Sequence, residues 1–234
     1  MPPFFDLRIN PPKIEENLLE DFLRTLSLLG FRGFSVYNLN NALKNALSEL
    51  EKLSKDYGLD YVKRIDLRPK SKGDLNRLLR KNRHLFEIVV VIPTTREVAR
   101  HAAIDRRTDV ICFEEHERLF DYTQAHLMSS NEKVLEIPIN PLLKNFSQPL
   151  LKQYYKLVSI SQFFNLKIVA TSGATHPLEL RAPRDLCSIL SLFEHEDPSY
   201  SCVRHTPFQI IKTNRMKLSD RFVLPGVIIE SKED

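Results

Sequence analysis

Glycine is scarce in this sequence of 234 residues. It has 6 glycines, whereas an average frequency of about 7% gives roughly 16 for this length. Neither the G-x-G-x-x-G fingerprint of dinucleotide-binding folds nor the Walker loop of nucleoside triphosphatases is present. Both motifs need glycines because the backbone must approach phosphate groups closely. The sequence therefore excludes these two classes of nucleotide-binding motif.

Cysteines and long apolar runs are also few. The three cysteines, Cys112, Cys187 and Cys202, are odd in number and far apart in the sequence, which argues against a disulfide framework and a zinc cluster. No apolar run approaches the ~18 residues of a membrane helix, and residues 1–10 lack the layout of a signal peptide. We therefore expect a soluble, reduced, cytoplasmic protein that does not bind a membrane.

The composition is that of a folded and nearly neutral protein. Hydrophobic residues make up 42% of the chain, and 34 lysines and arginines oppose 30 acidic residues, which gives a net charge of +4. This balance argues against disorder.

Segments with strand character alternate with segments of helical spacing along the whole chain. Residues 88–92 form an unbroken β-branched run, as expected of a strand buried on both faces. Thr94 and Glu97 then have the spacing of a capping box that opens a helix, and Asn40 is a candidate N-cap for an earlier one. The predicted strands are residues 4–7, 34–37, 62–67, 88–92, 109–113, 134–137 and 166–170, with a weaker one at 200–203.

This alternation predicts an α/β fold with a parallel sheet and outer helices. The length and the repeat spacing fit a single TIM-like (β/α)8 barrel over residues 1–234, in which the last unit is irregular. Residues 225–234 are expected to add a stray strand or to dock on the bottom of the barrel. An open, doubly wound sheet is the alternative.

Cationic and hydroxyl side chains recur where the predicted strands end, which is the functional face of such barrels. Any single arginine is most simply a solvated surface charge, but the shared bias predicts an anion site that suits phosphates. The candidate phosphate-binding or RNA-binding residues are Arg8, Arg68, Lys70, Arg96, His116, Thr171, Ser172, Gly173, Arg181 and Arg184.

The loop that begins at Thr171 is the sharpest local feature of this face. It follows the seventh predicted strand, where barrel enzymes often hold phosphate with backbone N–H groups, and Arg181 and Arg184 follow it in the sequence. In the alternative interpretation, Gly173 only turns the chain and Asp185 pairs with one of the two arginines.

A metal centre is not predicted. Metal-dependent barrel hydrolases usually place His-x-His at the end of the first strand, but this sequence has Asp6-Leu7-Arg8 there. The histidines that follow other strands lack ligand spacing, and Glu114 and Glu115 point to opposite faces if the strand continues through them. We therefore expect no catalytic residue, no metal ligand and no cofactor bound by the polypeptide.

Several segments resemble one known family. They are the Phe-Asp-Leu-Arg opening at 5–8, Gly-Phe at 33–34, Lys-Arg-Ile-Asp-Leu at 63–67, Val-Ile-Pro-Thr at 91–94, Asp-Val-Ile at 109–111, Ser-Gly-Ala at 172–174 and Glu-Leu-Arg-Ala-Pro-Arg-Asp-Leu at 179–186. The last two blocks are the distinctive ones, and the likeness spans nearly the whole chain. The family is the barrel-shaped protein subunit of archaeal and eukaryotic ribonuclease P, called protein component 3 in archaea. The chain resembles the archaeal members, because it ends soon after the last predicted helix.

The resemblance implies a role in removing the 5′ leader from precursor tRNA. In that enzyme the RNA subunit carries the chemistry, with Mg²⁺, and the polypeptide acts as a non-catalytic subunit. The implied partners are the ribonuclease P RNA, precursor tRNA, a small RRM-like protein subunit and the other ribonuclease P proteins. Ala182 departs from the serine of many relatives, which removes a helix-capping hydroxyl.

Two further hypotheses come from the residues themselves. A freestanding metal-dependent phosphoesterase or nuclease would share the barrel and use His116. A barrel that serves only as a protein scaffold would carry its arginines incidentally.

Overall fold

The computed structural model describes residues 2–12, 16–37, 44–114, 116–193, 199–219, 222–224 and 227–228. The candidate N-cap Asn40, the residue Glu115 and most of the 225–234 tail lie outside this part of the chain. Of the tail, Val227–Ile228 forms strand β10, which pairs antiparallel with β9 (Phe222–Leu224).

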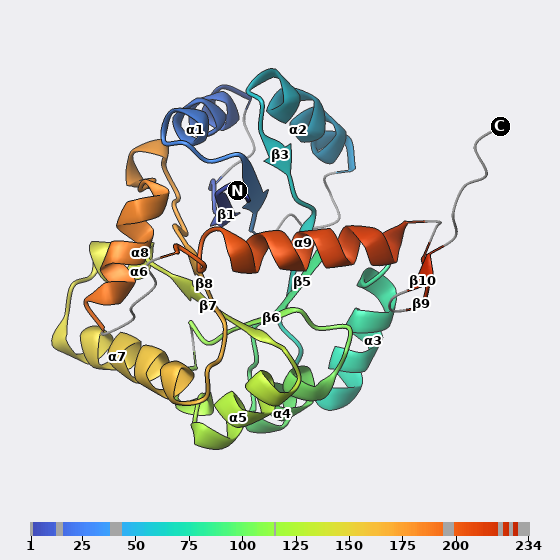
Figure 1. The fold of residues 1–234 in the computed structure, drawn as a ribbon, viewed down its shortest axis with the longest axis vertical. Coiled ribbons are helices and arrows are strands. Elements are labelled where there is room, and N and C mark those ends of the chain that lie inside the picture. The colour runs from blue at the N-terminus through green and yellow to red at the C-terminus, as the bar shows by residue number, and fades with distance from the viewer. Residues whose placement is uncertain are drawn as a thin grey trace.

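Parallel strands form the centre of the fold (Figure 1). One sheet has the order β1-β2-β3 and the other the order β4-β5-β6-β7-β8. Strand β3 of the first sheet is separated from β4 of the second by only two residues, Val62 and Lys63, so the backbone passes almost directly from one sheet into the other. The strands are β1 (Phe5–Ile9), β2 (Gly33–Val36), β3 (Asp60–Tyr61), β4 (Arg64–Leu67), β5 (Ile88–Val91), β6 (Val110–Cys112), β7 (Val134–Pro138) and β8 (Ile168–Thr171).

Helices surround these strands and cover their outer faces (Figure 1). Most of them are amphipathic and bury one face against the sheet. They are α1 (Glu16–Leu28), α2 (Lys44–Asp56), α3 (Lys72–Asn82), α4 (Arg96–Ile104), α5 (Tyr122–Ser130), α6 (Asn140–Lys144), α7 (Gln148–Phe163), α8 (Pro183–Ser191) and α9 (His205–Leu218), with short 3₁₀ turns η2 (Glu117–Leu119) and η3 (Pro177–Glu179). Among the described residues, every helix falls short of the length and apolarity that a membrane crossing needs.

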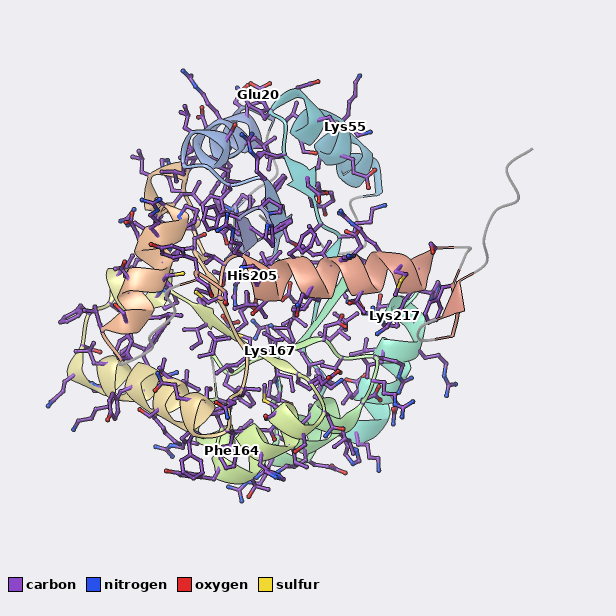
Figure 2. The ribbon with its side chains drawn as sticks, in the orientation of Figure 1. Glu20, Lys55, Phe164, Lys167, His205 and Lys217 are labelled. Atoms are coloured by element: carbon purple, nitrogen blue, oxygen red, sulfur yellow. The ribbon has the colours of Figure 1, made fainter. Side chains whose placement is uncertain are left out.

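Two apolar cores follow from the alternation of strand side chains. The larger core lies between the sheet and the helices, and the smaller one, with Leu7, Val90 and Val169, fills the inside of the barrel. Helix α9 crosses the molecule in Figure 1, beginning at His205 (Figure 2). Its Ile211 joins the inner core, and its Arg215 pairs with Asp60 at the start of β3. Helix α9 therefore closes the N-terminal end of the barrel.

The architecture is TIM-like, as predicted, but the last unit differs from a (β/α)8 barrel. Residues 200–203 form turns rather than the expected strand. The carbonyls of Cys202 and Val203 still accept hydrogen bonds from Ala170 of β8 and Phe5 of β1. A turn thus occupies the gap between the first and last strands, and the described strands do not form one continuous closed ladder.

The start of α4 is shifted by one residue from the predicted capping box. Thr95 is the N-cap, and its side chain accepts a hydrogen bond from the backbone of Val98. The Thr94 hydroxyl instead donates to the carbonyl of Pro69, at 2.7 Å. Thr94 therefore ties the loop after β4 to the loop after β5.

Candidate nucleic-acid interface

The loop at 172–174 joins β8 to β1. The N–H of Gly173 donates to the Arg8 carbonyl at 2.9 Å, and the N–H of Asn10 donates to Ala174 at 2.7 Å. The N–H of Ser172 donates to Asp6 Oδ1 at 3.1 Å. Gly173 has a φ of +63°, a conformation that glycine adopts without the steric penalty of a Cβ.

The loop forms its hydrogen bonds within the protein in this structure, and its contact with phosphate stays a prediction. The backbone N–H groups that would hold an anion already bond within the protein, and the side chains of Thr171 and Ser172 are buried. The Thr171 hydroxyl donates to Glu136 at 3.1 Å. The physical reason is the gap between β1 and β8, where residues 201–203 form turns and do not supply the hydrogen bonds of a further strand. Residues 172–174 therefore hold β1 and β8 together through hydrogen bonds, and we call this loop the β1–β8 clasp.

A buried ion-pair network, centred on Arg64, fills the C-terminal half of the barrel. The Arg64 guanidinium donates to both oxygens of Glu136, at 2.7 Å each, and to the Leu7 carbonyl at 2.6 Å. It also pairs with Asp66 at 2.5 Å. The side chains of Arg64, Asp66 and Glu136 are each 1% exposed.

These contacts place the positive charge of Arg64 against the negative charges of Asp66 and Glu136 inside the barrel. Burial alone would raise the pKa of Glu136, but the guanidinium groups of Arg64 and Arg8 lower it. Sequence reasoning did not single out Arg64 or Glu136. A signal was available, because Arg64 and Asp66 alternate within one strand and must point to the same side.

Arg8 belongs to the same network. A bulge in β1, between Asp6 and Ile9, adds one residue relative to β2. Arg8 lies over the Tyr37 ring, with 4.0 Å between the guanidinium carbon and the ring centroid, and pairs with Glu114 at 2.5 Å. Its side chain is 6% exposed, so Arg8 forms an internal ion pair, and the RNA contact predicted for it stays a prediction.

Asp6 is a buried carboxylate of this region, and one of its two oxygens lacks a hydrogen-bond partner among the described residues. It accepts N–H bonds from Arg8 and Ser172 through Oδ1, whereas Oδ2 is buried without a hydrogen-bond partner. Desolvation by burial raises the pKa of Asp6 to about 6.

The other predicted cations lie at the rim of the strand ends. Arg68 is 37% exposed and bonds to Tyr37 and, at 3.0 Å, to Glu114. The guanidinium of Arg181 is turned inward and donates to the carbonyls of Leu178 and Leu180, at 3.1 and 2.8 Å. The exposed members of the predicted set are Arg68, Lys70, Arg96, His116 and Arg184.

Glu179 organises the loop beside the clasp. It accepts hydrogen bonds from Thr175 N–H at 2.7 Å and from the Asn140 amide at 2.8 Å, and it pairs with Lys144 at 2.6 Å. Burial opposes ionisation, but the Lys144 ammonium and these hydrogen bonds lower the pKa of Glu179 to about 2. This residue of the Glu-Leu-Arg-Ala-Pro-Arg-Asp-Leu block thus holds α6 against the loop after β8.

The donor chemistry of the barrel mouth does not suit a metal ion. Among the described residues, no group of three or more His, Cys, Asp and Glu side chains is arranged to hold one. The carboxylates of Asp66, Glu114 and Glu136 face guanidinium groups, which occupy the space that a cation would need. A metal-dependent hydrolase is therefore not favoured.

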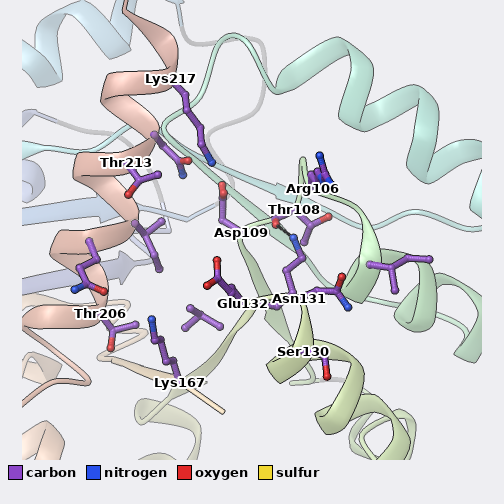
Figure 3. Close-up of a pocket in the computed structure, with 16 residues that line it drawn as sticks. Arg106, Thr108, Asp109, Ser130, Asn131, Glu132, Lys167, Thr206, Thr213 and Lys217 are labelled. Carbon is purple, nitrogen blue, oxygen red and sulfur yellow. Dashed lines mark hydrogen bonds between the residues drawn. The ribbon is translucent and has the colours of Figure 1, made fainter. Parts of the chain in front are cut away.

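A cavity of about 710 Å³ lies at the opposite end of the barrel. Figure 3 shows Lys217 and Thr213 of α9 on one wall and Asp109 and Thr108 on another. Its lining mixes both signs of charge, with Lys133, Lys167 and Lys217 near Asp109 and Glu132. None of the predicted phosphate-binding residues lines this cavity.

Comparison with known proteins decides the family. The family model described as RNase P subunit p30 matches residues 3–219. The chain belongs to the RNase P subunit p30 family.

Relatives of this chain in archaea carry a consistent description. Ribonuclease P protein component 3 of Methanococcoides burtonii is 23% identical, and the match covers 97% of this chain and 93% of that protein. The corresponding protein of Methanothermobacter thermautotrophicus is 22% identical, with 89% of each chain covered. A chain in a cryo-EM structure of archaeal ribonuclease P with mature tRNA has the same fold, with a TM-score of 0.82, 20% identity, and 98% of this chain and 100% of that chain covered.

Proposed function

We propose that this chain is a non-catalytic protein subunit of ribonuclease P that supports RNA-catalysed removal of the 5′ leader from precursor tRNA. The observation that carries the proposal is the family match over residues 3–219. Its relatives are described as ribonuclease P protein components, and a protein of the same fold occurs in a complex with mature tRNA. The proposed partners are the ribonuclease P RNA, precursor tRNA, a small RRM-like subunit and other ribonuclease P proteins, in the cytoplasm.

The geometry supports two different roles for the cations: the buried ones stabilise the barrel, and the exposed ones are available to RNA. Arg8 and Arg64 neutralise carboxylates inside the barrel, which holds the strand ends in place. Arg68, Lys70, Arg96, His116 and Arg184 are exposed at the rim, where they can meet RNA phosphates. Mg²⁺ belongs to the RNA subunit in this account.

Reconstitution of precursor tRNA cleavage tests the proposal. The ribonuclease P RNA and the small protein partner are incubated with Mg²⁺ and precursor tRNA, with and without this chain. We expect faster 5′-leader removal when the chain is present and no cleavage by the chain alone. The same rate with and without the chain would contradict the proposal.

The alternative, a freestanding metal-dependent nuclease, has its own diagnostic result. The purified chain is incubated with precursor tRNA and Mg²⁺, Mn²⁺ or Zn²⁺, without any RNA subunit. Cleavage that His116→Ala abolishes would establish the alternative and overturn the proposal.

A further inference from the structure

A cationic groove lies beside the strand-end face, between η2 and the first half of α7. Its volume is about 630 Å³. The residues that line it include Arg118, Asn145, Ser147, Lys152, Gln153 and Lys156, and among the lining residues that the structure describes none is a carboxylate. A groove with positive charge of this kind attracts a polyanion.

The spacing of two groove lysines, Lys152 and Lys156, does not stabilise helix α7. Lys152 and Lys156 are four residues apart on α7, so they lie on one face of the helix and repel each other. Both are exposed, and in the described part of the chain neither ammonium forms an ion pair. An anion from outside the chain that lies between the two ammonium groups would offset this repulsion.

Two exposed aromatic residues are sequence neighbours of the lining residues, although neither is itself among those that line the groove. Phe146, which is 74% exposed, lies between the lining residues Asn145 and Ser147, and Tyr155, 49% exposed, precedes Lys156. Aromatic faces next to cationic side chains are the combination that binds single-stranded nucleic acid, because bases stack on the rings while phosphates meet the cations.

The groove continues the strand-end face. Turn η2 comes shortly after β6, and α6 begins two residues after the end of β7. Because Arg118 of η2 and Pro141 of α6 line the groove, it lies beside these two strand ends. We propose that it binds a single-stranded segment of RNA, with Lys152 and Lys156 at phosphates and Phe146 and Tyr155 against bases. The proposal rests on the proposed function, and it identifies an RNA-binding surface that the sequence did not predict.

Salt titrations of RNA binding test the groove. The probes are the ribonuclease P RNA and a labelled oligouridylate, which has no secondary structure. The double variant Lys152→Ala/Lys156→Ala should flatten the plot of log affinity against log salt by about 1–1.5 units, since each single-strand contact contributes roughly 0.7. The control is Lys52→Ala/Lys55→Ala on α2, which removes the same charge on the other side of the molecule from α7 (Lys55 and Phe164 in Figure 2) and should leave the slope unchanged.

The aromatic contribution has a different signature. Phe146→Leu should weaken oligouridylate binding by about 5-fold or more at every salt concentration and leave the slope unchanged, because stacking involves no counterion release. Circular dichroism and thermal melting of each variant establish that it is folded.

The outcomes separate this proposal from the proposed function. If the unmodified chain binds neither RNA, the proposed function is contradicted as well. If it binds RNA and the double lysine variant keeps both affinity and slope, the groove proposal alone is overturned. Loss of the small protein partner with unchanged RNA affinity would also overturn it, because the surface would then be a protein interface.

Discussion

Arg64 and Glu136 face each other across the inside of the barrel, joined by two hydrogen bonds of 2.7 Å. Each side chain is 1% exposed, and each belongs to a different strand, β4 and β7. Strands β5 and β6 lie between them in the sheet, so the pair spans the barrel rather than neighbouring strands. The network around Arg64 thus takes the place of an apolar layer near the strand ends.

Removal of Arg64 should destabilise the fold strongly. Arg64→Ala leaves the carboxylates of Asp66 and Glu136 buried without their partner, which should lower the free energy of unfolding by about 3–5 kcal/mol. Denaturant unfolding measures the change. The control is Arg77→Ala, which removes an arginine that is 76% exposed from its pair with Asp74 and should change stability by less than about 0.5 kcal/mol. Similar effects from the two substitutions would refute a structural role for the buried network.

Arg8 and Arg184 should differ in the property that each one affects. Arg8→Ala breaks a buried pair with Glu114 and should lower stability by about 3 kcal/mol without altering the salt dependence of RNA binding. Arg184 is exposed at the first turn of α8. Arg184→Ala should keep stability and flatten the plot of log affinity against log salt by up to ~1 unit.

The control for this contrast is Arg24→Ala, an exposed arginine of α1, which should affect neither quantity. The assays are chemical unfolding and RNA binding over a range of salt concentrations. A flattened salt slope in Arg8→Ala, with stability retained, would restore Arg8 as an RNA contact.

The carboxyl group of Asp6 should make stability depend on pH. Its pKa is raised by burial to about 6 in the folded protein, against about 3.9 in an unfolded chain. A raised pKa means that the folded state binds the proton more tightly, so this contribution to stability is fully present below pH ~4 and is lost as pH rises through about 6.

The variant Asp6→Asn isolates this effect. The amide oxygen can still accept the N–H bonds from Arg8 and Ser172, whereas no charge is buried. Between pH 4 and pH 7 the unmodified protein should lose on the order of 2–3 kcal/mol relative to Asp6→Asn. Unfolding of both proteins at several pH values gives the difference, and parallel pH profiles would show that Asp6 does not titrate as proposed.

Gly173 should be sensitive to a single methyl group. An alanine Cβ there would meet Pro138 at 3.4 Å, an ordinary contact, so the penalty comes from the φ of +63°. Gly173→Ala should destabilise the protein by about 1 kcal/mol and loosen the β1–β8 clasp. Gly73→Ala, in the first turn of α3 with its nearest contact at 3.9 Å, is the matched control and should be neutral or stabilising; thermal unfolding compares the two.

Local patterns predicted most of the strands, because an unbroken β-branched run or an alternating apolar pattern identifies a strand. The run at 88–92 predicted β5, and Ala182 is the N-cap of α8 without a side-chain hydrogen bond, as the missing hydroxyl implies. The closure of the barrel was beyond these patterns. It depends on contacts between residues far apart in the chain, such as Gly173 with Arg8, and periodicity carries no information about such contacts.

The same limit explains why local patterns could not separate buried from exposed cations among the predicted site residues. A residue such as Arg8 at a strand end is equally consistent with a solvated cation and with an internal ion pair, and only the positions of Tyr37 and Glu114 decide between them. The groove residues Lys152 and Lys156 lie on helix α7 and not at a strand end, so the rule that locates barrel sites did not reach them.

The salt dependence of RNA binding tests the central claim most directly, namely that the exposed strand-end cations, and not the buried arginines, meet RNA. The variant carries alanine at Arg68, Lys70, Arg96 and Arg184 together, and its binding to ribonuclease P RNA is compared with that of the unmodified chain. The account predicts a slope flatter by about 2–4 units with thermal stability retained. An unchanged slope in a folded variant would contradict it.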